Sequence, residues 1–211
     1  MKRNILMCGV LTTVVFLAGC GGINLERLSP LPRQTTLEKI MGELENLENY
    51  QAVTEVSYRS NKNINTYTVK QFARSTGQYR TEVIGPEHVA GTILIADGAQ
   101  LHQINTRLGL SQITAYEPLK DRSILLLTNF IQNKNENTII SEEETITTLH
   151  NILENSNNPY LHSQRLVIDN ETLRPITLTT YDINDKPRVI LAYTEIFFNI
   201  PLEESLFLIE P

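Results

Sequence analysis

The sequence contains little cysteine: of its 211 residues only Cys8 and Cys20 are cysteines, and both lie near the N-terminus. Residues 21–211 therefore have no thiols to pair as a disulfide and no thiolate ligand for a metal. A chain of this length buries enough apolar surface to be stable without such crosslinks. We therefore expect one domain held together by its hydrophobic core, with no cofactor and no metal.

Motifs that bring catalytic or metal-binding groups together are also missing. Neither an HxH nor an HExxH pattern includes any of the four histidines, His88, His102, His150 and His162. No glycine-rich phosphate loop follows the N-terminal segment, and residues 109–113 lack the second glycine of a nucleophile elbow. The acidic run at 142–144 is typical of a solvated surface. The sequence thus favours a protein that is not an enzyme.

Tryptophan is absent, so tyrosine and phenylalanine supply all the aromatic side chains. Four tyrosines fall on predicted strands, namely Tyr58, Tyr67, Tyr79 and Tyr193. Such residues line a groove, or they belong to the core of the sheet with their hydroxyls at its rim. The sequence leaves both interpretations open.

The N-terminal apolar run is too short to be a good membrane-spanning helix, which needs about 20 apolar residues. It covers residues 5–18, only 14 residues, and follows Lys2 and Arg3. A basic start, a short apolar core and small residues before a cleavage point are typical of a secretory signal. The tetrapeptide Leu17-Ala18-Gly19-Cys20 resembles the lipobox of bacterial lipoproteins.

The lipobox resemblance implies cleavage between Gly19 and Cys20 and a diacylglycerol, with fatty acids such as palmitate, on the Cys20 sulfur. Two acyl chains hold a protein stably on a membrane without a spanning helix. We expect a signal peptide over 1–19, a lipidated tether over 20–34, and a folded domain over 35–211. This places the protein on the extracytoplasmic face of the cell or spore membrane. The alternative is an ordinary secretion signal that leaves Cys20 free.

Positive charge is scarce in this sequence. The formal net charge is −6 at pH 7, and removal of Lys2 and Arg3 with the signal peptide leaves −8. An acidic surface disfavours binding to nucleic acid and to anionic lipid headgroups. The expected partners are therefore a membrane, through the lipid on Cys20, and another protein.

The folded part begins with a predicted amphipathic helix. Thr35 and Glu38 have the spacing of a capping box, which satisfies two amides at a helix N-terminus. Apolar residues then recur at helical spacing and predict about four turns ending near Tyr50: Leu37, Ile40, Met41, Leu44 and Leu47. A second, buried helix is predicted over residues 124–131, with Asp121 or Ser123 as its N-cap.

Elsewhere the apolar period is two, with turn residues between the segments. Strands are predicted over 50–58, 66–73, 79–84, 92–96, 101–105, 111–116, 144–153, 160–169, 175–182 and 188–198. For 138–153 a helix starting at Ser141 is the alternative, but the β-branched run Thr145–Thr148 favours a strand. About ten strands and two or three helices predict an α+β fold. It is one large curved antiparallel β-sheet, a half-barrel, whose concave face is covered by helices that leave an apolar groove.

This order of elements resembles the LolA/LolB-like lipoprotein-carrier fold over residues 35–211. The likeness is carried by Tyr50-Gln51-Ala52-Val53, by the strand–Asp–Gly–strand hairpin at 95–101, and by residues 166–193. Within this fold, the lipobox, the Asn158-Pro159-Tyr160 turn and the motif at 169–175 resemble the GerS-like germination lipoproteins of spore-forming clostridia. Arg59 and Arg74 are candidates for the cavity residues of the carriers, and neither is assigned.

The germination resemblance implies a non-enzymatic accessory protein that is required for spore germination and binds a cell-wall (cortex peptidoglycan) amidase. The enzyme would be an N-acetylmuramoyl-alanine amidase, and a homodimer is a further option. The alternative is a carrier that holds acyl chains or lipoproteins in a hydrophobic cavity. A wide apolar cavity beneath the first helix would favour the carrier. We expect that space to be filled, beneath Leu37, Ile40, Leu44 and Leu47.

Overall fold

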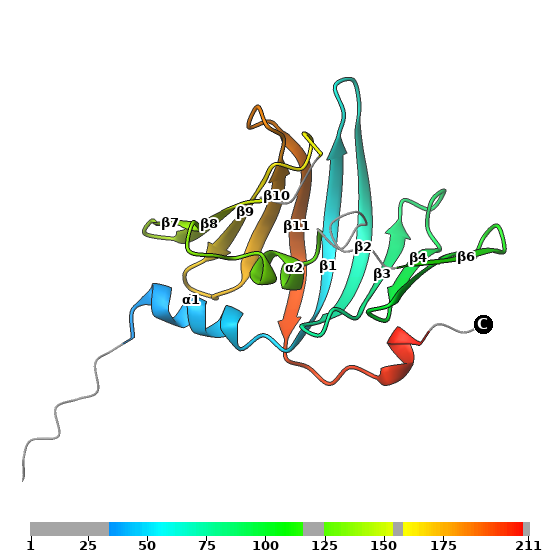
Figure 1. Ribbon diagram of the computed structural model, residues 1–211, viewed down its shortest axis with the longest axis horizontal. Helices are drawn as coiled ribbons and strands as arrows, with labels where there is room; N and C mark the ends of the chain where they lie inside the picture. The colour runs from blue at the N-terminus through cyan, green and yellow to red at the C-terminus, as the bar shows by residue number, and fades with distance from the viewer. Residues whose placement is uncertain (1–33, 116–124, 154–157, 209–211) are drawn as a thin grey trace, which may run out of the picture. The chain divides into compact units, whose positions relative to one another are not determined.

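The computed structural model describes residues 34–115, 125–153 and 158–208, which belong to one compact unit (Figure 1). The first six strands are β1 (Asn49–Arg59), β2 (Ile64–Arg74), β3 (Tyr79–Gly85), β4 (Thr92–Ala96), β5 (Gln100–Asn105) and β6 (Leu110–Ala115). The next five are β7 (Ile139–Glu142), β8 (Ile146–Ile152), β9 (Ser163–Asp169), β10 (Pro175–Tyr181) and β11 (Pro187–Phe198). Two α-helices, α1 (Thr36–Glu45) and α2 (Leu127–Gln132), and a short 3₁₀ helix, η2 (Glu204–Phe207), complete the described elements.

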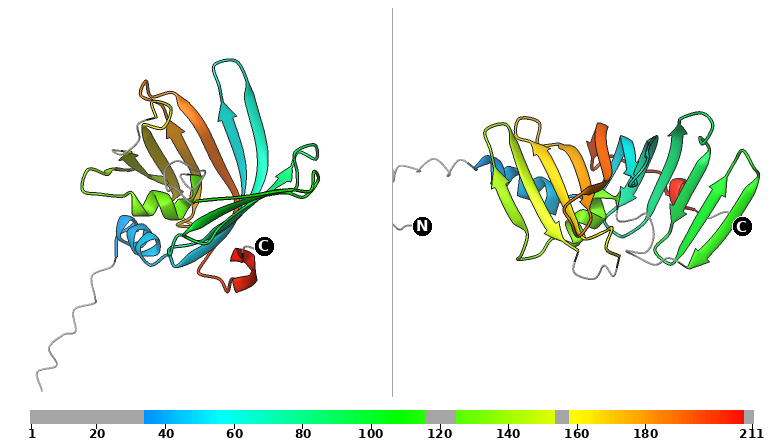
Figure 2. Two further views of the ribbon diagram at one scale, coloured as in Figure 1. Left: turned by 45° about the vertical axis from the view of Figure 1, so that its right-hand side comes forward. Right: turned by 90° about the horizontal axis from the view of Figure 1, so that it is seen from above.

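The eleven described strands form one antiparallel sheet in the order β6-β5-β4-β3-β2-β1-β11-β10-β9-β8-β7. Two meanders, β1 to β6 and β7 to β11, are joined where β1 pairs with β11, for example at Val56 opposite Leu191. The sheet curves, and α2 lies within the curve (Figure 2). The predicted α+β fold with one large curved antiparallel sheet, a half-barrel, is confirmed.

The first helix begins as predicted and ends earlier than predicted. Thr35 Oγ1 accepts the Glu38 amide at 3.1 Å, and Glu38 Oε2 accepts the Thr35 amide at 2.8 Å, which is a complete capping box. The prediction that the helix continues to Tyr50 is wrong, because α1 stops at Glu45. Asn199 fixes this end: its side chain accepts the amides of Glu48 and Asn49 and donates to the Asn46 carbonyl.

The main core lies between one face of the sheet and the two helices. Ile40 and Leu44 of α1 and Phe130 of α2 are almost fully buried, and they belong to one cluster with inward-facing strand residues such as Leu166 and Leu191. Helix α2 confirms the predicted buried helix, although it starts at Leu127. Its predicted caps, Asp121 and Ser123, lie outside the described residues.

The Leu127 amide at the start of α2 donates to the Tyr50 hydroxyl at 3.2 Å, and that hydroxyl donates to Gln71 Oε1 at 3.1 Å. Tyr50 is fully buried, so it links α2 to β1 and β2 within the core. A tyrosine of β1 thus satisfies one of the amides that helix starts leave without a partner inside the helix.

The segment predicted as one strand over 144–153 is instead part of a hairpin. Strand β7 precedes it, Glu142 is paired with Thr147, and residues 143–145 form the turn. Asn170 stabilises this turn, because its Nδ2 donates to the carbonyls of Glu143 and Glu144. The three glutamates at 142–144 are exposed, as expected for a solvated surface.

A second, smaller buried cluster lies on the opposite face of the sheet. Side chains alternate along a strand, so Phe72 and Arg74 point away from the main core that contains Ala73. The Arg74 guanidinium forms two hydrogen bonds with Glu204 and lies 4.5 Å from the centre of the Phe207 ring. Phe207 is 2% exposed, so η2 is anchored on this face by a ring as well as by an ion pair.

Candidate functional site

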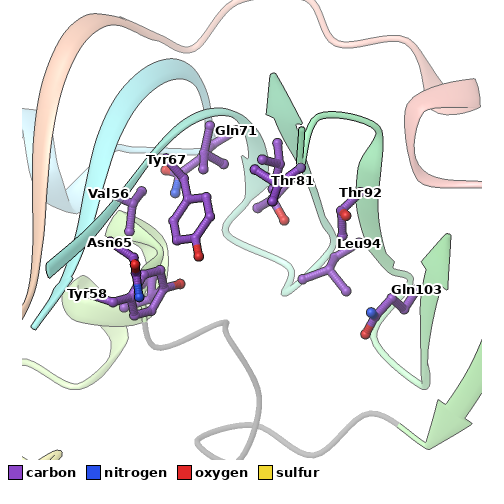
Figure 3. A pocket seen from close by; sticks show the side chains of 13 residues that line it. Val56, Tyr58, Asn65, Tyr67, Gln71, Thr81, Thr92, Leu94 and Gln103 are labelled. Atoms are coloured by element: carbon purple, nitrogen blue, oxygen red, sulfur yellow. The ribbon is translucent and has the colours of Figure 1, made fainter. Parts of the chain in front are cut away.

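A groove of about 470 Å³ lies on the face of β1 to β5 (Figure 3). The apolar part of its lining consists of Val56, Val69, Val83, Val89, Leu94 and Leu125. The rest is neutral and polar, and includes Tyr58, Asn65, Tyr67, Gln71, Thr81 and Gln103. None of the described residues that line this groove carries a charge.

Strand register brings these residues together. Alternation on β2 places Tyr67, Val69 and Gln71 on one face. Across the strands, Gln71 is paired with Thr81, Thr81 with Leu94, and Leu94 with Gln103, so the polar and apolar side chains form one continuous surface. Helices α1 and α2 lie beside β1 and the β8 to β11 half of the sheet, so neither of these two helices covers the groove (Figure 1).

Several polar side chains of the groove have no hydrogen-bond partner among the described residues. The side chains of Asn65, Thr81 and Gln103 and the hydroxyl of Tyr67 make no hydrogen bond with other described residues. Gln71 uses Oε1 for the Tyr50 hydroxyl, which leaves its Nε2 for a ligand or water. The rings of Tyr58 and Tyr67 pack edge to face, with their centres 5.8 Å apart and an angle of 71° between their planes.

A second hollow, of about 380 Å³, adjoins the groove, because Tyr58 and Asn65 line both. Its charged residues are Arg59 and Arg188. Arg188 is fully engaged: Nε donates to Asp182 Oδ2 at 2.7 Å, Nη1 donates to Asn61 at 2.9 Å, and the guanidinium lies 5.0 Å from the centre of the Tyr160 ring. Arg59 has no ion pair with any described residue.

Asp182, which accepts a hydrogen bond from Arg188 of this hollow, also accepts the amides of Asn184 and Lys186 in the turn between β10 and β11. It is 2% exposed, and the Lys186 amide, followed by Arg188 and the Asn184 amide, lowers the pKa of its carboxyl group. A carboxylate whose pKa is lowered by folding stabilises the fold above its unfolded pKa, and that stability is lost as the pH falls through the folded value. The ionised form of Asp182 therefore stabilises the domain at neutral pH.

We expect Asp182→Asn to lower the melting temperature at pH 7, because asparagine keeps an acceptor for the two amides and loses the charge that faces Arg188. The difference in melting temperature between the two proteins should shrink as the pH falls below about 4, the ordinary pKa of an aspartate, because the unfolded wild-type chain then binds a proton that the folded carboxylate takes up only at lower pH. Thermal unfolding of both proteins from pH 7 to pH 2.5 measures this difference. A difference in melting temperature that stays constant with pH would contradict the stabilising role assigned to the charge of Asp182.

Two of the four tyrosines considered from the sequence, Tyr58 and Tyr67, line the groove. The other two belong to the core: Tyr79 is 1% exposed, and the hydroxyl of Tyr193 is buried with no hydrogen-bond partner among the described residues. The expectation of a filled space beneath α1 is confirmed for Ile40, Leu44 and Leu47, which are buried in the core, whereas Leu37 is only half-buried and lies outside that cluster. The groove lies elsewhere on the same face.

The other candidate residues do not meet at one site. Cys20 and Gly19, the expected lipidation and cleavage residues, lie outside the described residues. Arg74 is on the face opposite the groove, where it binds Glu204. No cluster of three or more potential metal ligands occurs in the described part of the chain. His102 is 4% exposed, and its Nε2 lies 2.6 Å from Ser111 Oγ on β6.

Within the described ranges, no helix is both long enough and apolar enough to cross a bilayer.

Sequence reasoning missed the three carboxamides of the groove, Asn65, Gln71 and Gln103. Asn65 and Gln71 lie on β2 and Gln103 lies on β5, and nothing near any one of them in the sequence marks it as a ligand-binding residue. Only the register of β2 with β3, β4 and β5 brings Gln71 and Gln103 onto one surface.

Solved structures share this fold at low sequence identity. A LolA superfamily protein from Nitrosomonas europaea matches with a TM-score of 0.50 and 10% identity, over 83% of this chain and 98% of that chain. An uncharacterised conserved protein from Thermus thermophilus matches with a TM-score of 0.50 and 14% identity, over 84% and 95% of the two chains. A chain from the complex of the CwlD amidase with the GerS lipoprotein, from Clostridioides difficile, matches with a TM-score of 0.48 and 20% identity, over 81% and 98%.

The half-barrel described above is therefore the LolA fold. No curated protein sequence matches the chain. The model of one family, described as sporulation protein YdcC-like, matches residues 2–207, which is nearly the whole chain. The chain has the LolA fold, and it belongs to the YdcC-like sporulation protein family.

Proposed function

We propose that this protein is a lipid-anchored, non-enzymatic accessory protein that acts in spore germination by binding a cell-wall amidase outside the membrane. Membership of a sporulation family supports the germination role. The lipobox sequence Leu17-Ala18-Gly19-Cys20 supports the anchor, with the signal peptide over 1–19, the tether over 20–34 and the domain over 35–211. The observation that supports a protein partner is strand β6, the last strand at one edge of the sheet among the described residues.

Strand β6 has the properties of an edge that pairs with another chain. All six of its residues, Leu110–Ala115, are exposed, and none carries a charge. Leu110 and Ile113 are 60% and 46% exposed, on opposite faces of the strand, and Leu108 in the preceding turn is 68% exposed. Natural proteins normally protect such edges with charged residues or proline. An unprotected edge accepts a partner strand, whose main chain completes the hydrogen-bond ladder.

The opposite edge of the sheet is protected. Strand β7 has only four residues, and it ends in Glu142, which is followed by Glu143 and Glu144. Three exposed carboxylates at the end of a short strand repel an incoming strand and shorten the available ladder. Strand addition is therefore favoured at β6 over β7.

The carrier alternative is supported by one observation, the size of the groove. A volume of about 470 Å³ falls in the range of small-molecule sites. Its lining is less suitable, because an acyl chain would remove water from carboxamides and hydroxyls without replacing their hydrogen bonds. Each such loss costs about 1–3 kcal/mol. We therefore rank the carrier second.

Ile113→Lys tests the proposed edge. The full lipidated chain in nanodiscs is titrated with a purified N-acetylmuramoyl-alanine amidase of the CwlD class, the enzyme class suggested by the germination resemblance. A lysine on the β6 edge should weaken binding by at least about tenfold, since a charge there must be desolvated in the complex. Ile139→Lys on β7 is the matched control, because Ile139 is also exposed, at 61%, and lies on the other edge.

No amidase binding by the wild-type chain, or equal weakening by the two lysine variants, would overturn the proposed interface. Self-association that Ile113→Lys abolishes, in a chain that binds no amidase, would assign the edge to a homodimer instead. Thermal unfolding of each variant confirms that the fold is kept, which is expected because both side chains are exposed.

A further inference from the structure

The groove on β1 to β5 has no role in the proposed protein–protein contact, and its lining suggests a ligand of its own. Among the described residues it is lined by no charged side chain, in a protein whose net charge is −6. A charged ligand would leave its charge unpaired there, which is costly in a desolvated site. The ligand of this groove is therefore neutral.

The ligand must also be rich in hydrogen-bonding groups. Asn65, Gln103 and Tyr67 each present polar atoms with no partner among the described residues, and Gln71 has its Nε2 available. Gln71 is 2% exposed, so a ligand that covers it and offers no acceptor would bury an unpaired amide. A ligand that supplies both donors and acceptors avoids this cost.

A peptide strand has no place in this groove. Strands β2 to β5 each have a neighbour on both sides, so their main-chain groups are already used in the sheet. Peptides that bind sheets by strand addition use an edge. Recognition in the groove therefore depends on side chains, and it suits a ligand whose polar groups surround a compact ring.

The two tyrosines add the last requirement, a flat apolar face on the ligand. Tyr58 and Tyr67 are packed edge to face, and both line the groove, with their side chains directed into it (Figure 3). Aromatic side chains of this kind combine an apolar body with a polar tip. A pyranose ring has the matching shape, with C–H groups on its faces and hydroxyls at its rim.

We propose that the groove on β1 to β5 is a binding site for an uncharged glycan segment, held by the rings of Tyr58 and Tyr67 and by the carboxamides of Asn65, Gln71 and Gln103. N-Acetylated sugars suit the carboxamides well, because an acetamido group is both a donor and an acceptor. The adjoining hollow beyond Tyr58 and Asn65 leaves this end of the groove open to a longer chain. This proposal does not depend on the amidase partner.

Binding of chitotetraose, a neutral tetramer of N-acetylglucosamine, tests the proposal by calorimetric titration of the full chain in lipid nanodiscs. Wild type should bind it saturably, and Tyr67→Ala should weaken binding at least about tenfold, since it removes both a ring and a hydroxyl. Gln103→Ala, at an exposed position, should weaken it about threefold to tenfold without affecting the fold.

The matched control is Tyr181→Ala. Tyr181 is also half-buried and lies on β10, where its ring packs against Arg165, outside both hollows. Its loss should leave chitotetraose binding unchanged. The variants of Ile113 and Ile139 should likewise bind chitotetraose as the wild type does, so failure of the glycan site and failure of the amidase interface are separate results.

Three results would overturn the proposal. The first is no binding of chitotetraose by wild type up to about 10 mM, a concentration well above a millimolar Kd. The second is binding that Tyr67→Ala and Gln103→Ala leave unchanged, which would place the sugar elsewhere. The third is displacement of chitotetraose by palmitate at lower concentration, which would assign the groove to an acyl chain.

Discussion

Tyr50→Phe is expected to destabilise the domain by about 2–4 kcal/mol. The substitution removes one oxygen atom and leaves two buried groups without their partner, the Leu127 amide and Gln71 Oε1. Each unsatisfied buried group costs about 1–3 kcal/mol. Burial raises the pKa of the Tyr50 hydroxyl, so the group stays protonated and able to donate at all ordinary pH values. For a domain of this size the melting temperature should fall by roughly 5–15 °C.

Tyr193→Phe is the matched control for this prediction. Its hydroxyl is also buried, but it has no hydrogen-bond partner among the described residues. Removing a buried hydroxyl that bonds to nothing is neutral or slightly stabilising, by up to about 1 kcal/mol. Chemical denaturation of both variants measures the contrast. If Tyr193→Phe lowers the free energy of unfolding as much as Tyr50→Phe does, the difference in hydrogen bonding does not control stability here.

Features that depend on neighbouring residues could be predicted from the sequence. The capping box needs only Thr35 and Glu38, which lie within one turn of helix. The Asp97-Gly98 hairpin turn needs a glycine at positive φ and a side chain that accepts nearby amides, and Asp97 Oδ1 accepts those of Ala99 and Gln100 at 2.8 Å. Because side chains alternate along each strand, the positions of the apolar residues then indicate which side chains face the core and which face the surface.

Features that depend on distant residues could not be predicted. Helix α1 ends where Asn199 reaches its last turn from about 150 residues away, and no local signal at Leu47 or Tyr50 shows this. The β7–β8 turn is likewise held by Asn170, which lies in a different turn. The pairing of β1 with β11 joins the two halves of the sheet, and it too is invisible in the local pattern.

The candidate site was predictable in part for the same reason. Tyr58 and Tyr67 could be named as candidates from the sequence, because a large aromatic residue on a strand either belongs to the core or lines a groove. The choice between core and groove depends on tertiary packing: Tyr50 lies against the start of α2, whose Leu127 amide donates to its hydroxyl, whereas Tyr58 and Tyr67 line the groove. The carboxamides can be recognised as candidate binding residues only once the strand register is known, because it is the register that places them beside these rings.

If Cys20 carries the proposed lipid, its loss should move the protein from the membrane fraction to the soluble fraction almost completely. A thioether forms only on sulfur, so Cys20→Ser removes the attachment point of the diacylglycerol. Each buried CH₂ contributes about 0.8 kcal/mol to membrane binding, and two chains hold a protein stably where one binds only marginally. No other cysteine follows Cys20, so the folded domain should be unaffected.

The sharpest form of this test separates the lipid from the signal peptide. Cys20→Ser alone risks leaving the signal uncut and its apolar run in the membrane, so it is combined with Leu17→Ala and Gly19→Ala. With Ala18 these changes create the small-residue site at which ordinary secretory signals are cut. The triple variant should be exported, cut and recovered in the soluble fraction with the wild-type melting temperature. The variant with Leu17→Ala alone keeps the thiol of Cys20, so this protein should stay with the membrane.

Two results would contradict the proposed anchor: membrane retention of the cut triple variant, or recovery of the wild-type protein without lipid on Cys20. Neither result bears on the proposed sheet edge or on the proposed groove, which have their own tests.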